Sequence, residues 1–364
     1  MPAKKITGSF MMSSFSCVIM ASGLGIRFGG NKLMADFGGF PMVHWILEAS
    51  KMCFDDVVVV TRNIGVENLC NSRGIKVITH EFPYRSDTVR LGVKSLDVNT
   101  SGVVFCLADQ PFLSIDTLLD FKEAVSNEPD KIWRTRSGNI IGSPTYFPVS
   151  LFEELTSLPQ DKGGSYLCKI HPELVREFNI QNPLELKDID TKDTYEELRP
   201  QASCLDIWSK YLKSGKKHLF ITGDRGEGKS TLLKSLLPLV GTNPSGLISY
   251  ATKGVDVRLQ NRISGEEIII GKFNPESRMS PILDALNGRG VEFIESLKES
   301  SDKWVTIDEI GYLEESSDLY KNAIRELLKA KRVIAVVRKD GYPFLQELVS
   351  RDDAMVINIK RDSR

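Results

Sequence analysis

Two short stretches of the sequence carry residue types and spacings suited to phosphate chemistry. The first, "GDRGEGKS" from Gly223 to Ser230, matches the pattern G-x-x-x-x-G-K-[ST] at every fixed position. In such a loop the backbone N–H groups surround a β-phosphate, the lysine reaches the β- and γ-phosphates, and the hydroxyl binds Mg²⁺. The apolar run "HLFITG" precedes it and the helical pattern "STLLKSLL" follows it. Motif and context together predict nucleoside triphosphate binding, the alternative being a chance glycine turn.

An acidic pair later in the chain supplies the groups that such a loop needs for hydrolysis. In "WVTIDEIG" the apolar run ends at Asp308, and Glu309 follows. We expect Asp308 to hold Mg²⁺ together with Ser230, Glu309 to polarise the attacking water, and Lys229 to act on the phosphates. The residues expected to bind this nucleotide are Gly223, Asp224, Arg225, Gly226, Glu227, Gly228, Lys229, Ser230 and Thr231.

The second stretch, "IMASGLGIRFGGNK" from Ile19 to Lys32, at first resembles a dinucleotide fingerprint. That fingerprint needs a third glycine and an acidic residue at the end of the next strand. Here Phe28 stands at the third glycine position, and the next apolar run ends in "VVVVTRN" without a carboxylate. Nicotinamide binding is therefore disfavoured. Glycines interspersed with Arg27 and Lys32 instead predict a cradle for a triphosphate, the alternative being a flexible turn with incidental charges.

A single carboxylate is placed to act beside this loop. The apolar run "GVVFCLADQPF" reaches Asp109, where an open α/β sheet presents groups to a ligand at its carboxyl edge. An isolated aspartate after a strand is more often a turn or cap residue. Together with the glycine-rich loop, however, Asp109 is predicted to hold Mg²⁺.

The elements that must position these residues form an alternating pattern. Short apolar runs at residues 17–20, 56–61, 75–79 and 102–109, and again at 218–223, 303–308, 332–337 and 354–359, are separated by helical patterns. This alternation predicts an α/β fold with mainly parallel sheets. In "PMVHWILEASKMC" a helix is expected to start at Pro41 and to bury one face, formed by Met42, Trp45, Ile46, Ala49 and Cys53. We expect two domains, residues 1–200 and 201–364.

Composition narrows the partners. The 364 residues include 47 basic and 48 acidic side chains, so no bulk attraction to nucleic acid or to an anionic membrane is expected. The six cysteines are scattered without a C-x-x-C pair, which fits a cytoplasmic protein. The N-terminal stretch "MPAKKITGSFMMSSFSCVIMA" has a basic start, but serines interrupt its apolar run, so a signal peptide is disfavoured. No apolar run is long enough for a membrane span.

Several segments of the second half carry a family resemblance. "LFITGDRGEGKSTLL", "VTIDEIGYLE" and "FLQELVSRDDAMVINI" are similar to the small nucleoside-triphosphatases first known from thermophiles. The resemblance implies slow hydrolysis of nucleoside triphosphates with broad base tolerance. The charged segment that follows the second strand in that family is reduced here to "GLISYATKGVDVRLQ". Arg258 or Arg262 is left as a candidate phosphate-facing cation, with a solvated surface charge as the alternative.

Six segments in the first half, in order, resemble the nucleotidyltransferases of molybdenum cofactor biosynthesis, most closely the cytidylyltransferases. They are "VIMASGLGIRFGGNKL", "YRSDTVRLGV", "FCLADQP", "GNIIGSPTYFP", "LPQDKGGSYL" and "DIDTKDTYEEL", between residues 17 and 198. The resemblance implies a GT-A type, Rossmann-like nucleotidyltransferase sandwich, followed here by a P-loop NTPase α/β domain.

The same resemblance implies roles for individual residues. Asp109 is a Mg²⁺ ligand, Asp190 is a second acidic group near the metal, and Arg27 and Lys32 contact the triphosphate. The residues implied to line the nucleotide pocket are Ala21, Ser22, Gly23, Leu24, Gly25, Ser86 and Asp87. Gly142 and Pro144 are implied to shape the loop that faces the second substrate. Ser22 departs from the family pattern where the base is discriminated and leaves base choice open, although the triplet "SDT" favours the cytidylyl branch.

The expected reaction transfers a nucleoside monophosphate, CMP from CTP, to molybdopterin cofactor with release of pyrophosphate. A phosphate monoester is largely dianionic at neutral pH, so its oxygen can attack the α-phosphorus without a general base. Two alternatives stay open. In the first alternative, the chain is an NTPase-driven protein that binds the cofactor and delivers it to a molybdenum hydroxylase apoenzyme. In the second, it is a nucleotidyltransferase that acts on another phosphorylated small molecule.

Overall fold

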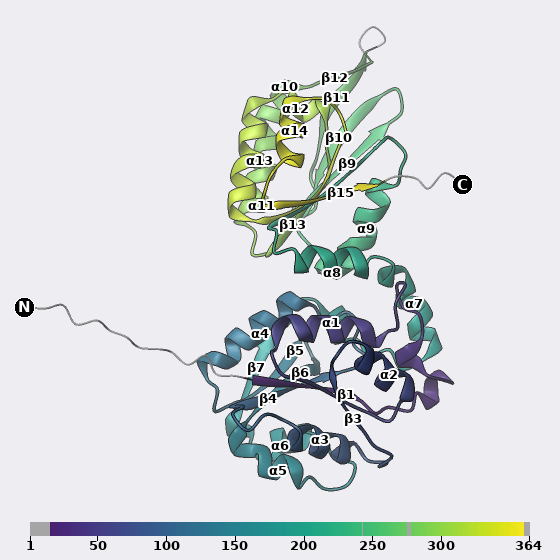
Figure 1. The fold of residues 1–364 in the computed structure, drawn as a ribbon. Helices are drawn as coiled ribbons and strands as arrows, with labels where there is room; N and C mark the ends of the chain where they lie inside the picture. The colour runs from purple at the N-terminus through teal and green to yellow at the C-terminus, as the bar shows by residue number, and fades with distance from the viewer. Residues whose placement is uncertain (1–14, 242, 275–277, 360–364) are drawn as a thin grey trace, which may run out of the picture. The chain divides into compact units, whose positions relative to one another are not determined.

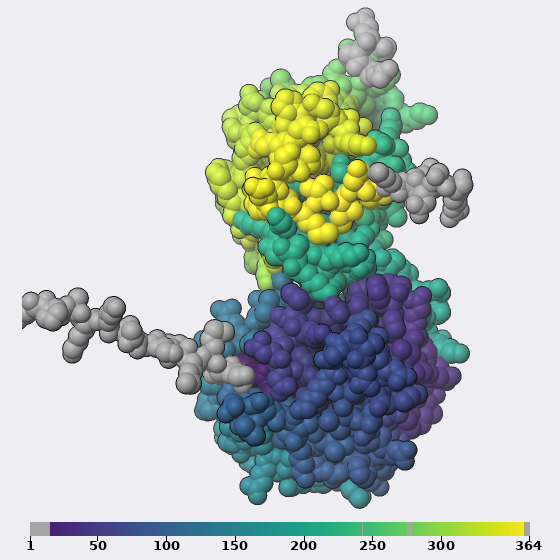
Figure 2. Space-filling view, viewed as in Figure 1, coloured from purple at the N-terminus to yellow at the C-terminus, as the bar shows by residue number. Residues whose placement is uncertain are grey.

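The computed structural model describes residues 15–241, 243–274 and 278–359. These residues form two compact units that divide between Leu205 and Asp206. In the space-filling view the first described residues, in purple and blue, belong to one unit and the last, in yellow, to the other (Figure 2). No helix within the described ranges is long and apolar enough to cross a bilayer. The basic start considered above as a signal peptide, within residues 1–14, lies outside the described residues.

The first unit is built on a seven-stranded sheet with the order β3-β2-β1-β4-β6-β5-β7. Its strands are β1 (Phe15–Ala21), β2 (Val57–Thr61), β3 (Lys76–Thr79), β4 (Gly102–Leu107), β5 (Ile132–Ser137), β6 (Ile140–Pro148) and β7 (Val175–Asn179). Strands β1 to β4 are parallel and correspond to the four predicted apolar runs. Strand β6 runs antiparallel to both β4 and β5, a mixed part of the sheet that the alternating pattern did not predict.

Helices cover both faces of this sheet. They are α1 (Val43–Cys53), α2 (Ile64–Ser72), α3 (Arg85–Lys94), α4 (Ile115–Asn127), α5 (Phe152–Thr156), α6 (Ser165–Ile170) and α7 (Lys192–Ala202), with 3-10 turns η1 (Ile26–Phe28), η2 (Lys32–Met34), η3 (Val149–Leu151), η4 (Pro172–Leu174) and η5 (Pro183–Leu186). Helices α1 and α4 lie on one face, and α3, α5 and α6 on the other (Figure 1). The expected buried face of α1 is confirmed, because all five of its predicted side chains are buried. Helix α1 begins at Val43 rather than at Pro41, which instead forms a β-bridge with Asp36.

The second unit contains an eight-stranded sheet with the order β12-β11-β10-β9-β13-β14-β8-β15. Its strands are β8 (His218–Gly223), β9 (Gly246–Thr252), β10 (Asp256–Asn261), β11 (Glu267–Asn274), β12 (Arg278–Pro281), β13 (Trp304–Ile310), β14 (Arg332–Val337) and β15 (Ala354–Ile359). Strands β9, β13, β14, β8 and β15 are parallel, whereas β9 to β12 form an antiparallel meander. The segment "GLISYATKGVDVRLQ" therefore supplies β9 and most of β10 of this meander.

Helices of the second unit are α8 (Leu205–Lys213), α9 (Lys229–Val240), α10 (Leu283–Ala285), the π-helix η6 (Leu286–Gly290), α11 (Val291–Glu299), α12 (Tyr312–Glu315), α13 (Asp318–Ala330) and α14 (Pro343–Val349). Helices α11 and α13 lie side by side on one face of the sheet (Figure 1). Their buried Leu297 and Ile324 belong to one apolar core with Phe220, Val305 and Val333 of the strands. This core holds the carboxyl ends of β8, β13 and β14 in register.

Stability of the second unit should depend on pH through His218. This ring is fully buried, and its Nδ1 accepts a hydrogen bond from the Val333 N–H at 3.2 Å. Burial lowers the pKa of His218 from 6.5 to about 4. The contribution of neutral His218 to the free energy of unfolding is therefore complete above about pH 6.5 and is lost as the pH falls toward 4. In that range the imidazole is protonated in the unfolded chain but not in the folded one. We expect a loss of about 2 kcal/mol between pH 7.5 and pH 5. Urea unfolding of the wild type and of His218→Gln at both pH values measures it, and an equal loss in both proteins would contradict it.

Candidate active sites

The glycine-rich loop after β1 owes its shape to positions that only glycine can occupy without strain. Gly25 and Gly29, on either side of η1, have φ values of +63° and +74°. A Cβ on Gly25 would lie 2.3 Å from the carbonyl oxygen of Gly30. Any other residue at position 25 would be strained and would push the loop open. The loop therefore turns back on itself, with the N–H of Gly29 donating to the carbonyl of Gly25 at 3.0 Å.

Lys32 is the centre of a cluster of charges at the carboxyl edge of the first sheet. Its Nζ lies 2.6 Å from Asp109 Oδ2 and 2.7 Å from Asp190 Oδ1. The Nη2 of Arg27 lies 2.8 Å from Asp190 Oδ2. The N–H of Ile189 donates to the carbonyl of Asp109 at 3.0 Å, which ties the segment before α7 to the end of β4. The structure thus brings together four residues that the sequence singled out separately.

The charges of this cluster set one another's protonation. Burial opposes the effect, but the hydrogen bond and charge of Lys32, with Arg27, lower the pKa of Asp190. Burial also works against the ammonium of Lys32, yet Asp109 and Asp190 together raise its pKa. Neighbouring Asp188 differs: burial first, and the charge of Asp109 second, raise the pKa of its carboxyl. Lys32 and Asp190 therefore stay charged at neutral pH.

The donor set fits a divalent cation only when a substrate completes it. Among the described residues no group of three or more His, Cys, Asp or Glu side chains is arranged to hold a metal ion. Asp109 and Asp190 offer two carboxylates on either side of the Lys32 ammonium. Hard cations such as Mg²⁺ are commonly held by one or two carboxylates together with phosphate oxygens. These residues would hold such an ion jointly with a triphosphate.

A cavity of about 430 Å³ opens beside the cluster. Its wall includes most of the predicted nucleotide-binding residues of the loop, namely Ser22, Gly23, Leu24, Gly25, Arg27 and Lys32. Predicted Ser86 and Asp87 are both buried and lie outside its wall, because Asp87 caps α3 by accepting from the N–H of Tyr84 and pairs with Arg90. Ala21 is likewise buried within β1. Tyr84, Arg85 and Thr88 of the same segment line the cavity instead, with Phe82.

Ser22 is held by groups behind the cavity wall. Its Oγ lies 2.8 Å from Nε2 of His80 and 3.2 Å from the carbonyl oxygen of Val60. Thr88, on the same wall, lies 3.5 Å from the same imidazole nitrogen. Burial, with the charge of Arg62, lowers the pKa of His80, so the imidazole is neutral at neutral pH. Sequence reasoning missed His80, which follows β3 directly.

A second cavity of about 430 Å³ adjoins the first and shares Met20, Arg85, Leu107 and Asp188 with it. Its wall is apolar along one part and charged along another, and it includes Phe105, Ile140, Ile141, Gly142, Ser143, Thr145, Phe147, Leu186, Gln110, Arg134 and Lys187. Predicted Gly142 lies in this wall, whereas Pro144 lies between two lining residues. Two buried polar atoms at this wall, Gln110 Oε1 and Arg134 Nε, have no hydrogen-bond partner among the described residues.

In the second unit the predicted phosphate loop joins β8 to α9, which begins at Lys229 and contains the predicted helical stretch "STLLKSLL". Gly226 and Gly228 have φ values of +81° and +90°, which this tight loop requires. The Nζ of Lys229 donates to the carbonyl oxygens of Gly223 at 2.9 Å and Asp224 at 2.7 Å. The loop is thus formed, with its lysine folded across it.

The acidic pair lies beside this loop. Ser230 donates a hydrogen bond to the Asp308 carboxylate, while burial, the larger effect, raises the pKa of Asp308. The other oxygen, Asp308 Oδ1, is buried and has no partner among the described residues. An unpartnered carboxylate oxygen next to a serine hydroxyl fits a divalent cation at this position. Glu309 lies 3.4 Å from the guanidinium of Arg338.

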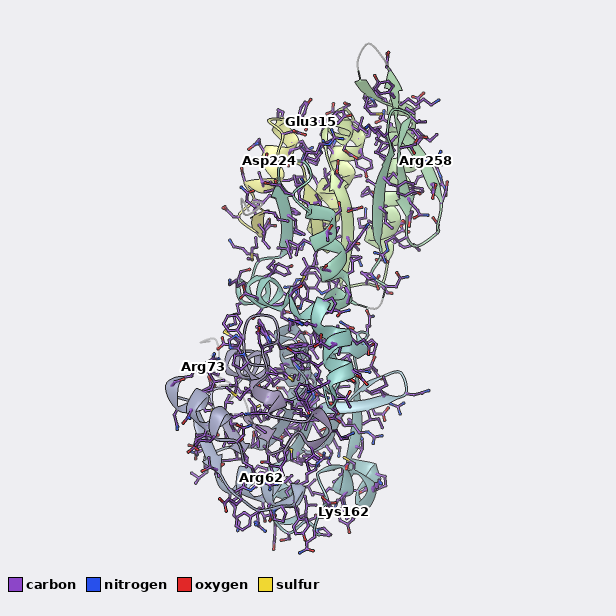
Figure 3. The ribbon with its side chains drawn as sticks, turned by 90° about the vertical axis from the view of Figure 1, so that its right-hand side faces the viewer. Arg62, Arg73, Lys162, Asp224, Arg258 and Glu315 are labelled. Carbon is purple, nitrogen blue, oxygen red and sulfur yellow. The ribbon has the colours of Figure 1, made fainter. Side chains whose placement is uncertain are left out.

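Both arginines proposed to face the phosphate are paired with other side chains. Arg258, on β10, pairs with Asp256 at 3.2 Å and Glu267 at 3.7 Å. It lies among the meander strands, well apart from Asp224 of the loop (Figure 3). Arg262 donates to Asn243 at 2.8 Å. Lys339, in the segment that directly follows β14, does contact the loop, with its Nζ 3.3 Å from Oδ2 of Asp224. Its position at the carboxyl edge of the sheet is one that the sequence pattern could have indicated.

Comparison with known proteins defines the class of each unit. Residues 17–175 match the family described as MobA-like NTP transferase domain, and residues 218–364 match the family described as NTPase. The protein is therefore an enzyme that joins a MobA-like nucleotidyltransferase domain to a P-loop nucleoside-triphosphatase domain. The predicted combination of domains and the predicted fold class are confirmed.

Individual relatives match one domain at a time. Nucleoside-triphosphatase THEP1 of Thermotoga maritima is 26% identical over 155 residues, which is 40% of this chain and 88% of the relative. The 3-deoxy-manno-octulosonate cytidylyltransferase of Colwellia psychrerythraea is 29% identical over 130 residues, 35% of this chain and 45% of the relative. Among solved structures, Rv0371c from Mycobacterium tuberculosis is 24% identical, with a TM-score of 0.47 over 51% of this chain and 97% of its own.

Proposed function

We propose that the first domain transfers CMP from CTP to molybdopterin cofactor and that the second hydrolyses nucleoside triphosphates, each with Mg²⁺. The observation that carries the proposal is the pair of adjoining cavities. One is lined by the phosphate-binding loop and its cations, the other by apolar and cationic side chains, and both meet at Asp188 and Arg85. A transferase needs two such compartments, because donor and acceptor must meet in line.

The donor compartment supports attack at the α-phosphorus. Arg27 and Lys32 would bind phosphate oxygens, and Asp109 and Asp190 would hold Mg²⁺ beside them. When bound there, Mg²⁺ neutralises charge that builds up between the two anions. The acceptor phosphate oxygen forms a bond to the α-phosphorus, and the bond from that phosphorus to the pyrophosphate oxygen breaks. No general base is required because the attacking phosphate is already ionised.

The acceptor compartment favours an anion with a flat ring over a sugar phosphate. Arg85, Arg134 and Lys187 outnumber Asp188 among its charged side chains. Phe105 and Phe147 contribute apolar surface suited to a ring, whereas a sugar presents hydroxyls to most of its surroundings. Gln110 and Arg134 line this cavity, and a side-chain amide and a guanidinium are groups that match the hydrogen-bonding edge of a pterin.

Ser22 supports cytosine as the base. Its single hydroxyl hydrogen has acceptors inside the protein, namely the Val60 carbonyl and, in one tautomer, Nε2 of His80. A lone pair of Ser22 Oγ is what remains for the cavity. Such an acceptor suits the exocyclic amino group of cytosine and opposes the carbonyl oxygen that uracil carries at the same position.

Replacing Ser22 by alanine should therefore erode the choice of base. We expect the preference for CTP over UTP, measured as the ratio of kcat/KM values, to fall by about tenfold, the equivalent of one lost hydrogen bond. Ser126→Ala is a matched control, because the Ser126 hydroxyl also donates to a backbone carbonyl, but Ser126 is an exposed residue of α4. An unchanged ratio in Ser22→Ala would contradict this assignment.

The test of the whole proposal is incubation of the pure chain with Mg²⁺, molybdopterin cofactor and each α-labelled nucleoside triphosphate in turn. Release of pyrophosphate with formation of a labelled dinucleotide from CTP is the expected result. Hydrolysis without transfer would instead favour a delivery protein acting on a molybdenum hydroxylase apoenzyme. Transfer only to a sugar phosphate would overturn the pterin acceptor.

A further inference from the structure

Arg338 occupies a position that the hydrolytic site does not yet account for. It follows β14 directly, and its backbone N–H donates to the carbonyl of Ile310 at 3.0 Å. Its Nη1 lies 3.4 Å from Glu309 Oε1 and its Nε 3.5 Å from Asp340 Oδ2. The guanidinium also lies over the ring of Tyr312, 5.3 Å from its centroid. A single arginine is thus held against the group expected to polarise the attacking water.

Gly311 shows that the fold makes room for this side chain. Its φ of −138° and ψ of −157° are extended values that any residue can adopt, so backbone conformation does not require glycine here. A Cβ at this position, however, would lie 2.6 Å from Cδ of Arg338 and 3.5 Å from Glu309 Oε1. The glycine of the "DEIG" segment therefore leaves the space through which the Arg338 side chain reaches Glu309.

The segment that carries Arg338 lies beside the phosphate loop. The next residue, Lys339, places its Nζ 3.3 Å from Oδ2 of Asp224, the second residue of that loop. The backbone of Arg338 is thus bonded to β13, the strand that bears Asp308 and Glu309. The residue that follows Arg338 contacts the phosphate loop.

The charges involved indicate how a bound triphosphate would affect the ion pair between Arg338 and Glu309. In the structure the guanidinium of Arg338 and the carboxylate of Glu309 form an ion pair, so each balances the charge of the other. A triphosphate carries more negative charge than one carboxylate, and guanidinium groups bind phosphate oxygens through two parallel hydrogen bonds. The side chain of Arg338 is 28% exposed, so it is not locked in place by burial.

We propose that Arg338 is a catalytic residue that acts within its own chain on the γ-phosphoryl group. When a triphosphate binds, the guanidinium leaves Glu309 for the γ-phosphate oxygens, and Glu309 becomes free to orient water. Water forms a bond to the γ-phosphorus, and the bond from that phosphorus to the β–γ bridging oxygen breaks. The nucleoside diphosphate leaves, and the proton of the attacking water passes through Glu309 to phosphate or solvent. The role rests on the hydrolysis proposed for this domain.

Steady-state hydrolysis by the full chain tests this role. Arg338→Gln should lower kcat at least about a thousandfold, the low end for a transition-state arginine, with KM changed less than about threefold. Arg338→Lys should recover only part of the rate, because an ammonium lacks the planar fork. Arg325→Gln is the matched control: Arg325 also pairs with a glutamate, Glu347, and lies over an aromatic ring, Phe344, but it is a partly exposed residue of α13.

Two further measurements separate catalysis from support of the fold. Arg338→Gln should weaken binding of nucleoside diphosphate with aluminium fluoride, a mimic of the transferring phosphoryl group, about a hundredfold, but not binding of a non-hydrolysable triphosphate. Gly311→Ala should show the same pattern, because its Cβ would displace Arg338. Hydrolysis by Arg338→Gln within threefold of the wild type, or equal weakening of both ligands, would overturn the role. Absence of hydrolysis in the wild type would overturn the proposed function itself.

Discussion

Substitution of Asp109 by asparagine should lower the rate of nucleotidyl transfer by about a hundredfold or more, the usual cost of removing one electrostatic stabiliser of a transition state. Asp109 lies at the end of β4 and meets both Lys32 and the loop that carries the donor cations. The neutral amide keeps the size of the side chain but withdraws the charge that would hold Mg²⁺. The fold should survive, because Lys32 keeps its contact with Asp190.

Initial rates of pyrophosphate release at saturating Mg²⁺ measure this effect. Asp97→Asn is a suitable control, since Asp97 lies on an exposed turn, where its side chain caps the N–H of Asn99. Hydrolysis by the second domain should be unaffected in both variants. Normal turnover of Asp109→Asn at saturating Mg²⁺ would show that Asp109 is not the Mg²⁺ ligand of this reaction.

Substitution of Lys229 by alanine should reduce nucleoside triphosphate hydrolysis by about a hundredfold or more, because this ammonium supplies the charge that meets the β- and γ-phosphates. Among the described residues, the Nζ of Lys229 donates to two carbonyl oxygens of its own loop. Its loss should therefore leave the fold intact. Lys210→Ala, which removes an exposed lysine paired with Asp206 on α8, is the control.

The same variant tests whether the domains depend on each other. Transfer by the first domain should proceed at the wild-type rate in Lys229→Ala, as measured by labelled dinucleotide formation. A parallel fall in transfer would show that hydrolysis drives a step of the first reaction. Hydrolysis within threefold of the wild type would instead show that the loop is not the catalytic one.

Local sequence accounts for most of the elements and for the phosphate loop. The runs at 218–223, 332–337 and 354–359 match β8, β14 and β15 residue for residue, because each consists mainly of apolar residues and is flanked by charged ones. The start of α9 at Lys229 follows from the glycine spacing. The meander of β9 to β12 was missed, because strands that mix polar and apolar residues leave no comparable run.

From the sequence by itself, the resemblance of its motifs to two families indicated the two domain types, and motif spacing predicted a phosphate-binding loop in each, since such patterns act over a few residues. Only the tertiary structure decided which charges meet. Lys32 contacts Asp190 across 158 positions, and Ser22 meets His80 across 58. Arg338 reaches Glu309 because Gly311 leaves it room. Such contacts depend on which strands become neighbours in a sheet, and no spacing along the chain encodes that order.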